Sequence, residues 1–539
     1  MRRRLGIRRS AIVAHLVPST EGSLALSFQR RFLISVGANL VRAGLSFMTG
    51  MLLARGLGPT LYGDMAFLLG TFVSIRALLD LGSSSAFYTF ISQRPRGPVF
   101  FLRFSGWLAA QFVLTALFVC WLAPDSLFLR VWLTQPREMV VLALLASFVQ
   151  QPLWTVVGYV GESLRRTHQV QLLSTLVSLF YLLVVALLLW LDKLTLPRVF
   201  VLLALQYAVA SLGAYFWWRG EIGAQPASPP SWSDMFDEYR RYCAPMVALS
   251  VVTFFYSFLD RWLLQWAGGS EQQGFFQVAS QFAQVSLLAA ISVMNIFWRE
   301  VAEAWEKRDH AKVARLYQLI SRGLVLLSAA LTGLVLPWVP LLLGPLLGKA
   351  YDGAWLVLSV MLCYPVHQSL GQVNGAMLLA CGRTREQMFN GLLSMLVSIP
   401  VSYFVLAPEQ AAIPGLKLGA LGLALKALAV SLIMVNFQSW LLARYHGWRF
   451  DWRYQLFGIP FLILLGWVLS FPLQLAVDSL DLAWLGALLA FCVAAPLYLA
   501  AVLLLIWKCP KCLGLGPAEQ SLMLLLWQRI QCRFGAPRI

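Results

Sequence analysis

Charged side chains are scarce in this sequence, and acidic ones are the scarcest. Asp, Glu, Lys and Arg together make up 12% of the 539 residues, whereas soluble domains contain about 25%. Hydrophobic residues make up 59% of the chain. A soluble fold of this size cannot bury so much apolar surface. The composition therefore excludes a soluble globular protein.

The usual signatures of catalysis are also missing. The sequence has no Walker-type phosphate loop, no Gly-x-Ser-x-Gly elbow and no His-Glu-x-x-His pair, so we expect no enzyme of these classes. Among the eight cysteines, Cys509-Pro-Lys-Cys512 has the spacing of a redox or half-zinc motif, but no second pair accompanies it. We interpret this pair as structural or incidental, and we expect neither a metal nor a cofactor.

Long apolar runs fill most of the chain. Each is about 20 residues long, enough to cross the hydrocarbon core as a helix. Barrel strands would instead appear as short alternating segments. The sequence thus predicts an all-α polytopic membrane protein with about fourteen transmembrane helices. The predicted spans are 32–54, 64–86, 100–122, 139–160, 169–190, 197–218, 242–265, 273–297, 321–343, 353–379, 387–407, 416–442, 455–475 and 482–507.

The positions of the basic residues predict the orientation of these spans. Alternate connecting segments, beginning with the N-terminal one, hold most of the 42 Lys and Arg residues. The intervening segments hold only Arg55, Arg130, Arg137, Lys193, Arg198, Lys349 and Lys417. The positive-inside rule then places both termini in the cytoplasm. The net charge of +18 reflects this topology and contact with anionic lipids, and no clustered basic face points to nucleic acid.

The topology divides the chain into successive regions. We expect a basic cytoplasmic tail at 1–31, an N-terminal lobe (spans 1–6) at 32–218, a cytoplasmic linker at 219–241, a C-terminal lobe (spans 7–12) at 242–442, spans 13 and 14 within 443–507, and a cytoplasmic tail at 508–539. The inner stretch 299–322 is charged, with apolar residues interspersed. Two interpretations stay open for it: an amphipathic helix on the inner interface, or a plain solvated helix.

The two lobes share a short motif. Gly58 and Gly63 form a Gly-x4-Gly turn after the first span, and Gly269 and Gly274 form the same turn after the seventh span, 211 residues later. Because six spans separate the two turns, both halves face the same way. Parallel repeats of this kind build transporters in which the substrate passes between two lobes.

Several cations lie near the middle of predicted spans. Arg42 is central in span 1, Arg76 in span 2 and Lys426 in span 12, and Asn39 shares a helical face with Arg42. A central Arg or Lys costs about 2.5–3.5 kcal/mol on insertion scales, so these side chains must face a wet cavity or pair with acids. Taken singly, each of these residues can also be explained by a purely structural role. Together they predict a positive centre that binds an anion such as a phosphate.

Other polar groups in the spans suit coupling or gating. Asp80, one helical turn after the second of these arginines, can pair with it, and His367, just after Pro365, can titrate; both are candidates for ion coupling. Asp260 and Arg261 are gate candidates, as a latch between lobes or as a local pair near the outer end of span 7. The polar residues after Pro365 predict a broken or hydrated helix that forms a cavity wall.

A set of motifs at the start of each half resembles one family of transporters. The motifs are Leu52-Leu53-Ala54-Arg55-Gly56-Leu57-Gly58-Pro59, Tyr62-Gly63, Leu79-Asp80-Leu81-Gly82, Asp260-Arg261-Trp262-Leu263-Leu264, Gly274-Phe275-Phe276 and Gly382-Arg383-Thr384. This pattern resembles Wzx-type polysaccharide flippases, which belong to the superfamily of multidrug, oligosaccharidyl-lipid and polysaccharide exporters (the MATE/MOP superfamily). The resemblance covers spans 1–12, and spans 13 and 14 by topology.

The resemblance implies two six-helix lobes in a V shape plus two C-terminal helices. It implies a flippase that moves an undecaprenyl-pyrophosphate-linked oligosaccharide between leaflets of the bacterial cytoplasmic membrane by alternating access. The partners would be this lipid-linked oligosaccharide, membrane lipids, and a polysaccharide polymerase or glycosyltransferases. A proton or sodium gradient is the expected energy source.

Other functions stay open beside this one. A multidrug or cation antiporter of the same superfamily is disfavoured by the positive midplane, whereas a lipid II flippase fits the same charges. A membrane polysaccharide polymerase or ligase is disfavoured because the predicted outer loops are short.

Overall fold

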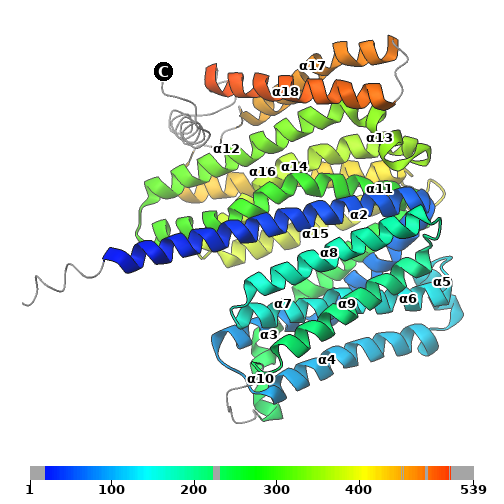
Figure 1. Cartoon of the computed structure of the whole chain (residues 1–539), viewed down its shortest axis with the longest axis vertical. Helices are drawn as coiled ribbons and strands as arrows, with labels where there is room; N and C mark the ends of the chain where they lie inside the picture. The colour runs from blue at the N-terminus through cyan, green and yellow to red at the C-terminus, as the bar shows by residue number, and fades with distance from the viewer. Residues whose placement is uncertain are drawn as a thin grey trace, which may run out of the picture.

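The computed structural model describes residues 18–221, 231–448, 454–479 and 484–508, together with positions 450, 452 and 510. Residues 1–17 of the predicted tail 1–31, residues 222–230 of the predicted linker 219–241, and most of the C-terminal tail with Cys509 and Cys512 lie outside these residues. The described chain is helical almost throughout, as the long apolar runs predict (Figure 1).

The helices form two groups in chain order. The first group is α2 (Pro18–Asp80), α3 (Ser83–Gln93), α4 (Pro98–Leu117), α5 (Asp125–Trp132), α6 (Arg137–Phe148), α7 (Trp154–Ser163), α8 (Thr167–Trp190), α9 (Leu196–Trp218) and α10 (Trp232–Cys243). The second is α11 (Val247–Glu306), α12 (His310–Val335), α13 (Val339–Leu347), α14 (Trp355–Ala380), α15 (Thr384–Leu406), α16 (Gly419–His446), α17 (Ile459–Ser479) and α18 (Trp484–Lys508).

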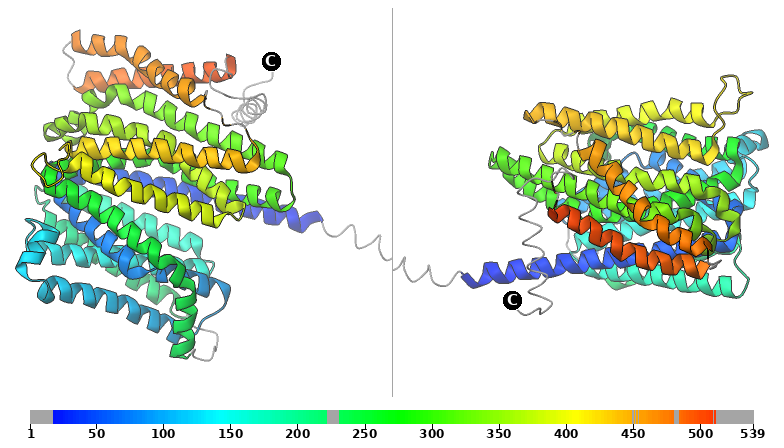
Figure 2. Two further views of the ribbon diagram at one scale, coloured as in Figure 1. Left: turned by 180° about the vertical axis from the view of Figure 1, so that it is seen from behind. Right: turned by 90° about the horizontal axis from the view of Figure 1, so that it is seen from above.

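These two groups make two lobes that meet along α2 and α11. In Figure 1 the lobe of α3–α10 lies below α2, while α12–α14 and α16–α18 lie above it. The first described helix begins and the last one ends at the same end of the bundle, which we call the inner end; Figure 2 shows the same arrangement from two other sides. The opposite end is the outer end. An even number of spans places the first and the last of these helix ends on the same side.

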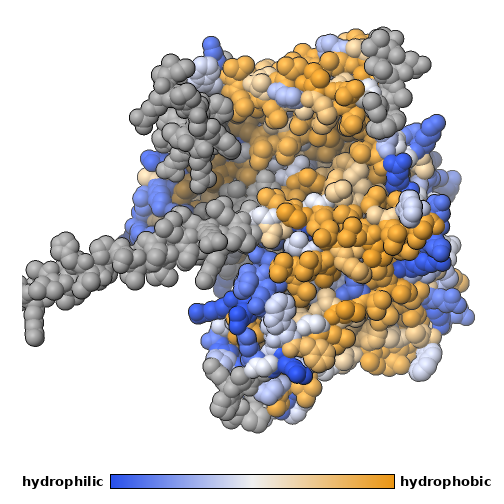
Figure 3. All heavy atoms as spheres, in the orientation of Figure 1, coloured by the Kyte–Doolittle hydropathy of each residue, from blue (hydrophilic) through white to orange (hydrophobic). Residues whose placement is uncertain are grey.

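On the face shown in Figure 3, a broad apolar surface covers the side of the bundle, and polar residues gather toward its two ends. Among the described residues, eleven helical segments are long and apolar enough to cross a membrane. Two of them, within α2 and α11, bend sharply in the middle, so each carries two of the predicted spans. The chain is therefore a multi-pass membrane protein, and the count of fourteen spans stays a prediction.

Each bend lies at the first glycine of a repeated motif. Gly58 has φ 72° and ψ 170°, and Gly269 has φ 79° and ψ −178°. A left-handed φ of this kind is easy for glycine and strained for other residues. The two bends have nearly the same backbone angles at equivalent positions, and this supports the predicted repeat.

The second glycine of each motif lets the two bends touch through their backbones. A methyl group at Gly63 would lie 1.8 Å from the carbonyl oxygen of Ser270, and one at Gly274 would lie 2.1 Å from the carbonyl oxygen of Pro59. The four positions form two equivalent pairs, because each partner is shifted by 211 residues. The lobes are thus in van der Waals contact at the outer end.

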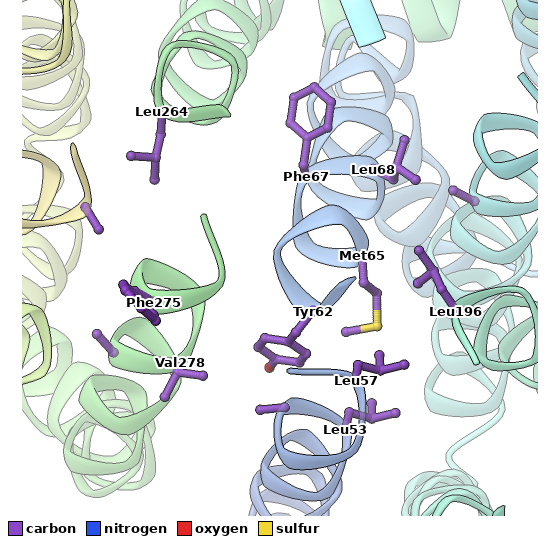
Figure 4. Packing of buried hydrophobic residues seen from close by; sticks show 14 of the residues in the cluster. Leu53, Leu57, Tyr62, Met65, Phe67, Leu68, Leu196, Leu264, Phe275 and Val278 are labelled. Carbon is purple, nitrogen blue, oxygen red and sulfur yellow. The ribbon is translucent and has the colours of Figure 1, made fainter. Parts of the chain in front are cut away.

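Apolar side chains complete this contact. Figure 4 shows Tyr62 pointing from α2 toward Phe275 and Val278 of α11, while Met65 points to the other side, toward Leu196 of α9. Tyr62, Phe275 and Val278 are buried in one cluster that includes residues of both lobes. The core therefore continues across the interface between the lobes.

Two predicted features differ from the structure. The stretch 299–322 is neither a separate interfacial helix nor a solvated one: α11 ends at Glu306 and α12 begins at His310, where Asp309 caps the new helix by accepting a hydrogen bond from the Lys312 backbone at 2.9 Å. Its apolar residues Val301 and Val313 are buried against the C-terminal lobe.

The second correction concerns Pro365. We expected a broken helix there, but α14 is continuous from Trp355 to Ala380. Among the polar residues after the proline, Asn374 is satisfied inside the lobe, because its amide donates to Ser439 Oγ at 2.8 Å and accepts from the Tyr317 hydroxyl at 2.8 Å. His367 Nδ1 and Gln372 Oε1 are buried without a hydrogen-bond partner among the described residues, so a hydrated helix stays a prediction.

Candidate functional site

The outer contact is held by a carboxylate that the sequence did not single out. Asp64 Oδ1 accepts hydrogen bonds from Ser270 Oγ at 2.6 Å, Gln135 Nε2 at 2.6 Å and Gln265 Nε2 at 3.3 Å. Asp64 and Gln135 belong to the N-terminal lobe, and the other two belong to α11. An acid directly after the second glycine of the repeat was the signal that could have found it.

A second polar link lies nearby along the same interface. The Tyr62 hydroxyl donates to Gln281 Oε1 at 3.0 Å, and Gln281 Nε2 donates to the Phe47 carbonyl at 3.0 Å. Gln281 comes from α11 and the other two residues from α2. The lobes are therefore joined by both backbone packing and hydrogen bonds on the outer side.

Arg261 also reaches across this interface. A methyl group at Gly70 of α2 would lie 2.0 Å from Arg261 Nη1, so the guanidinium rests against the opposite lobe. Nη1 is buried without a hydrogen-bond partner among the described residues. Gln265, which bonds to Asp64, lies one helical turn further toward the outer end. The predicted gate residue thus lies just inside the outer contact.

The Asp260 carboxylate pairs with a lysine on another helix and not with the neighbouring Arg261. Its Oδ2 lies 2.6 Å from Lys426 Nζ of α16, and its Oδ1 accepts a hydrogen bond from the Ser402 hydroxyl of α15. The Lys426 side chain is 2% exposed and the Asp260 side chain 17% exposed. The ammonium also lies 5.0 Å from the centre of the Tyr256 ring. Lys426 is therefore neutralised within the C-terminal lobe.

Arg76 lies in the N-terminal lobe with a neutral partner. Its Nη1 donates to Gln151 Oε1 at 3.3 Å, within the π-helical turn Val149–Leu153 that separates α6 from α7. Asp80 lies within electrostatic range of Arg76, but it accepts hydrogen bonds from the hydroxyls of Ser83 and Ser84 instead. The expected pairing of this arginine with Asp80 is absent from the described structure.

The remaining predicted residues lie apart from these groups. Arg42 and Asn39 are exposed on the first half of α2, and the Arg42 charge lies within range of the Tyr207 hydroxyl of α9. His367 is half-buried in α14, and its Nδ1 has no hydrogen-bond partner in the described part of the chain. The structure thus divides the predicted cations between the two lobes.

What distinguishes the spans is the lack of acid partners for three arginines. Arg42, Arg76 and Arg261 form no ion pair with any described carboxylate, whereas Lys426 does. In the low dielectric of a membrane an unpaired guanidinium is costly unless it serves a ligand. A guanidinium group has five N–H donors in a planar fork, and this geometry matches the oxygens of a phosphate.

Known proteins share parts of this sequence and of this fold. Residues 28–295 match the family model described as polysaccharide biosynthesis protein. The fold is similar to that of the lipid II flippase MurJ in an inward closed conformation, at 13% identity, over 87% of this chain and 98% of that one, with a TM-score of 0.61.

A more distant likeness is to an outward-facing multidrug resistance MATE family transporter of the MOP superfamily, at 13% identity, over 77% of this chain and 94% of that one, with a TM-score of 0.46. No curated protein matches the chain in sequence. Over residues 28–295, just under half of its length, this chain is thus similar to the polysaccharide biosynthesis protein family, and its helical fold is similar to that of MurJ.

Proposed function

We propose that this transporter is a flippase for an undecaprenyl-pyrophosphate-linked oligosaccharide, a repeat unit of a cell-surface polysaccharide. The observation that carries the proposal is the set of three spanning arginines without a carboxylate partner among the described residues. A diphosphate carries the charge and the oxygen geometry that guanidinium groups bind in bidentate fashion. The family match supports a role in polysaccharide synthesis.

The substrate would pass between the lobes while its lipid tail stays in the bilayer. In this conformation the outer side is closed by the contacts of Gly63 and Gly274 and by the Asp64 hydrogen bonds. Release to the outer leaflet requires these contacts to part, which is the closing and opening that alternating access demands. Arg261, just inside the contact, would hold the diphosphate until that step.

Coupling to an ion gradient is assigned to groups that can change their charge. His367 keeps this role in the proposal, since its Nδ1 is unpartnered in the described structure. Asp80 fits it less well, because Ser83 and Ser84 anchor its carboxylate at the start of α3. The Asp260–Lys426 pair is a further candidate, because a proton or a cation that binds the carboxylate would free the lysine.

The test is polymer export in a strain that lacks its own flippase. We expect Arg42→Ala, Arg76→Ala and Arg261→Gln each to lower export at least tenfold, about 1.4 kcal/mol or more of lost substrate stabilisation. Arg198→Gln, which changes an exposed basic residue in the first turn of α9, is the matched control. Normal export from the first three variants at normal protein levels would disprove the cationic site.

A lipid II flippase is the second candidate, favoured by the shared fold with MurJ over most of both chains. Its cargo also carries a polyprenyl pyrophosphate, so the arginines serve both alternatives. Growth of a strain depleted of its lipid II flippase distinguishes them. Rescue of growth, without rescue of polymer export in the other strain, would assign this cargo.

A further inference from the structure

A groove lined mainly by α10 and α4 has no part in the proposed binding of the diphosphate. It lies between α10 and α4 and has a volume of 390 Å³, within the range of about 300–1,000 Å³ that small-molecule sites occupy. Its walls are mostly apolar: Trp232, Phe236 and Tyr239 of α10 face Phe104 and Trp107 of α4.

The position of α10 explains why this groove lies at a membrane surface. The helix crosses the inner end of the N-terminal lobe, roughly at right angles to the long helices (Figures 1 and 2). It is fastened there because Glu238 accepts from Arg94 at 2.7 Å and from Arg96 at 2.6 Å, while Tyr242 bonds to Thr89 at 3.2 Å. A short amphipathic helix held in this way lies in the plane of the interface.

Large apolar side chains on α10 remain uncovered. Trp232 is 68% exposed and Phe236 is 66% exposed. Trp107 also lines the groove and is exposed, and its indole N–H donates to Ser83 Oγ at 3.1 Å. Tryptophan side chains of this kind are typical of the level of lipid headgroups.

Two basic side chains line the groove. The Arg103 guanidinium lies 4.4 Å from the centre of the Trp232 ring, and the exposed Arg240 side chain also pairs with Asp237 at 3.1 Å. Asp80 also lines the groove, and its Oδ1 accepts hydrogen bonds from the hydroxyls of Ser83 and Ser84. The groove therefore combines apolar walls with two arginines that can reach a bound headgroup.

We propose that this groove binds one anionic glycerophospholipid of the cytoplasmic leaflet. Its phosphate would lie at Arg103 and Arg240, and one acyl chain would follow Trp107 into the bilayer. Each basic side chain beside an anionic headgroup strengthens binding by about fivefold. The proposal rests on the proposed function only for the orientation that makes the inner end cytoplasmic.

Native mass spectrometry of the full-length protein in detergent tests this directly. We expect phosphatidylglycerol to bind more tightly than phosphatidylcholine with the same acyl chains. The double variant Arg103→Gln/Arg240→Gln should bind phosphatidylglycerol about 30-fold more weakly. Arg219→Gln is the matched control, since Arg219 lies at the same end, 5.6 Å from the centre of the Phe216 ring, and outside the groove.

A second substitution keeps the test independent of folding. Phe236→Glu places a charge at the mouth of the groove on an exposed position and should also weaken binding, whereas Phe216→Glu, on another exposed phenylalanine, should not. Equal binding of the two lipids, or unchanged binding by the groove variants, would overturn the proposal. So would a groove that retains a long-chain polyprenyl phosphate and no phospholipid. None of these measurements requires transport, so a failed flippase assay leaves them interpretable.

Discussion

The Lys426 ammonium lies 2.6 Å from the Asp260 carboxylate in a place where the lysine side chain is 2% exposed. Two charges removed from water in this way are individually expensive, and each compensates for the other. Ser402 satisfies the second carboxylate oxygen. At the scale of single residues, therefore, the stability of each buried charge depends on the other charge more than on the helix that carries it.

This dependence predicts a difference between single and double variants. Lys426→Met alone should destabilise the protein by about 3–5 kcal/mol, because the Asp260 charge stays buried without a partner. The double variant Lys426→Met/Asp260→Asn should recover most of that loss, since no charge remains. Thermal melting in detergent measures both. Equal losses in the single and double variants would show that the pair does not stabilise the lobe.

The sequence could not predict this pairing, although it placed both residues correctly in spans. Asp260 and Lys426 are 166 positions apart, and which faces of two helices meet depends on packing that periodicity alone does not determine. Asp64 was missed for the same reason, because its partners Gln135 and Ser270 come from other segments. Arg42, Arg76 and His367 were found because charge within an apolar run is visible in one dimension.

At the scale of elements, α2 and α11 differ from ordinary spans in their bends. Both turn back through a glycine with left-handed φ instead of ending in a loop. The span positions followed from hydropathy, since length and apolar content are local properties. Helix α10 lay mostly within the predicted linker 219–241, because a 12-residue amphipathic segment is too short to stand out as a span.

The backbone contact between the bends predicts the effect of adding a single methyl group. Gly63→Ala or Gly274→Ala should force the two bends apart, since the new atom would overlap a carbonyl oxygen. We expect the outer side to open and export to fall more than tenfold. Alkylation of a cysteine placed at the buried position Gln135, which bonds to Asp64 beside this contact, reports the opening as faster labelling.

The control for this change is a glycine in open space. At Gly106 of α4, a methyl group would have no neighbouring atom within 4 Å, so Gly106→Ala should leave labelling and export unchanged. Unchanged labelling in Gly63→Ala, at normal protein levels, would mean that the bends do not close the outer side.

At the scale of the whole molecule, the two lobes touch at more than the bends. Ser257 of α11 donates to Ser74 of α2 at 2.9 Å, further toward the inner end than Asp64 and its partners. A transporter that moves its lobes apart must break this bond in one state of its transport cycle. In this conformation the lobes are therefore joined by hydrogen bonds at several levels between the outer and the inner end.

A reversible covalent link across that line should stop transport. We expect the double variant Ser74→Cys/Ser257→Cys to form a disulfide under oxidation, to lose export, and to regain it on reduction. The single variants Ser74→Cys and Ser257→Cys are the controls, because neither can form this link. Full export by the oxidised double variant, with the disulfide shown to be complete, would contradict movement of the lobes at this level.

The contact between the bends has one more consequence. Gly63 touches Ser270 and Gly274 touches Pro59, and these are the same pair of positions counted once from each half. A contact in which a surface meets its own equivalent is isologous, the kind found between two identical subunits related by a twofold axis. One six-helix half thus carries a self-complementary patch, made largely of main chain. The single polypeptide keeps the geometry of a symmetric dimer, the arrangement that duplication and fusion of a shorter gene would leave behind.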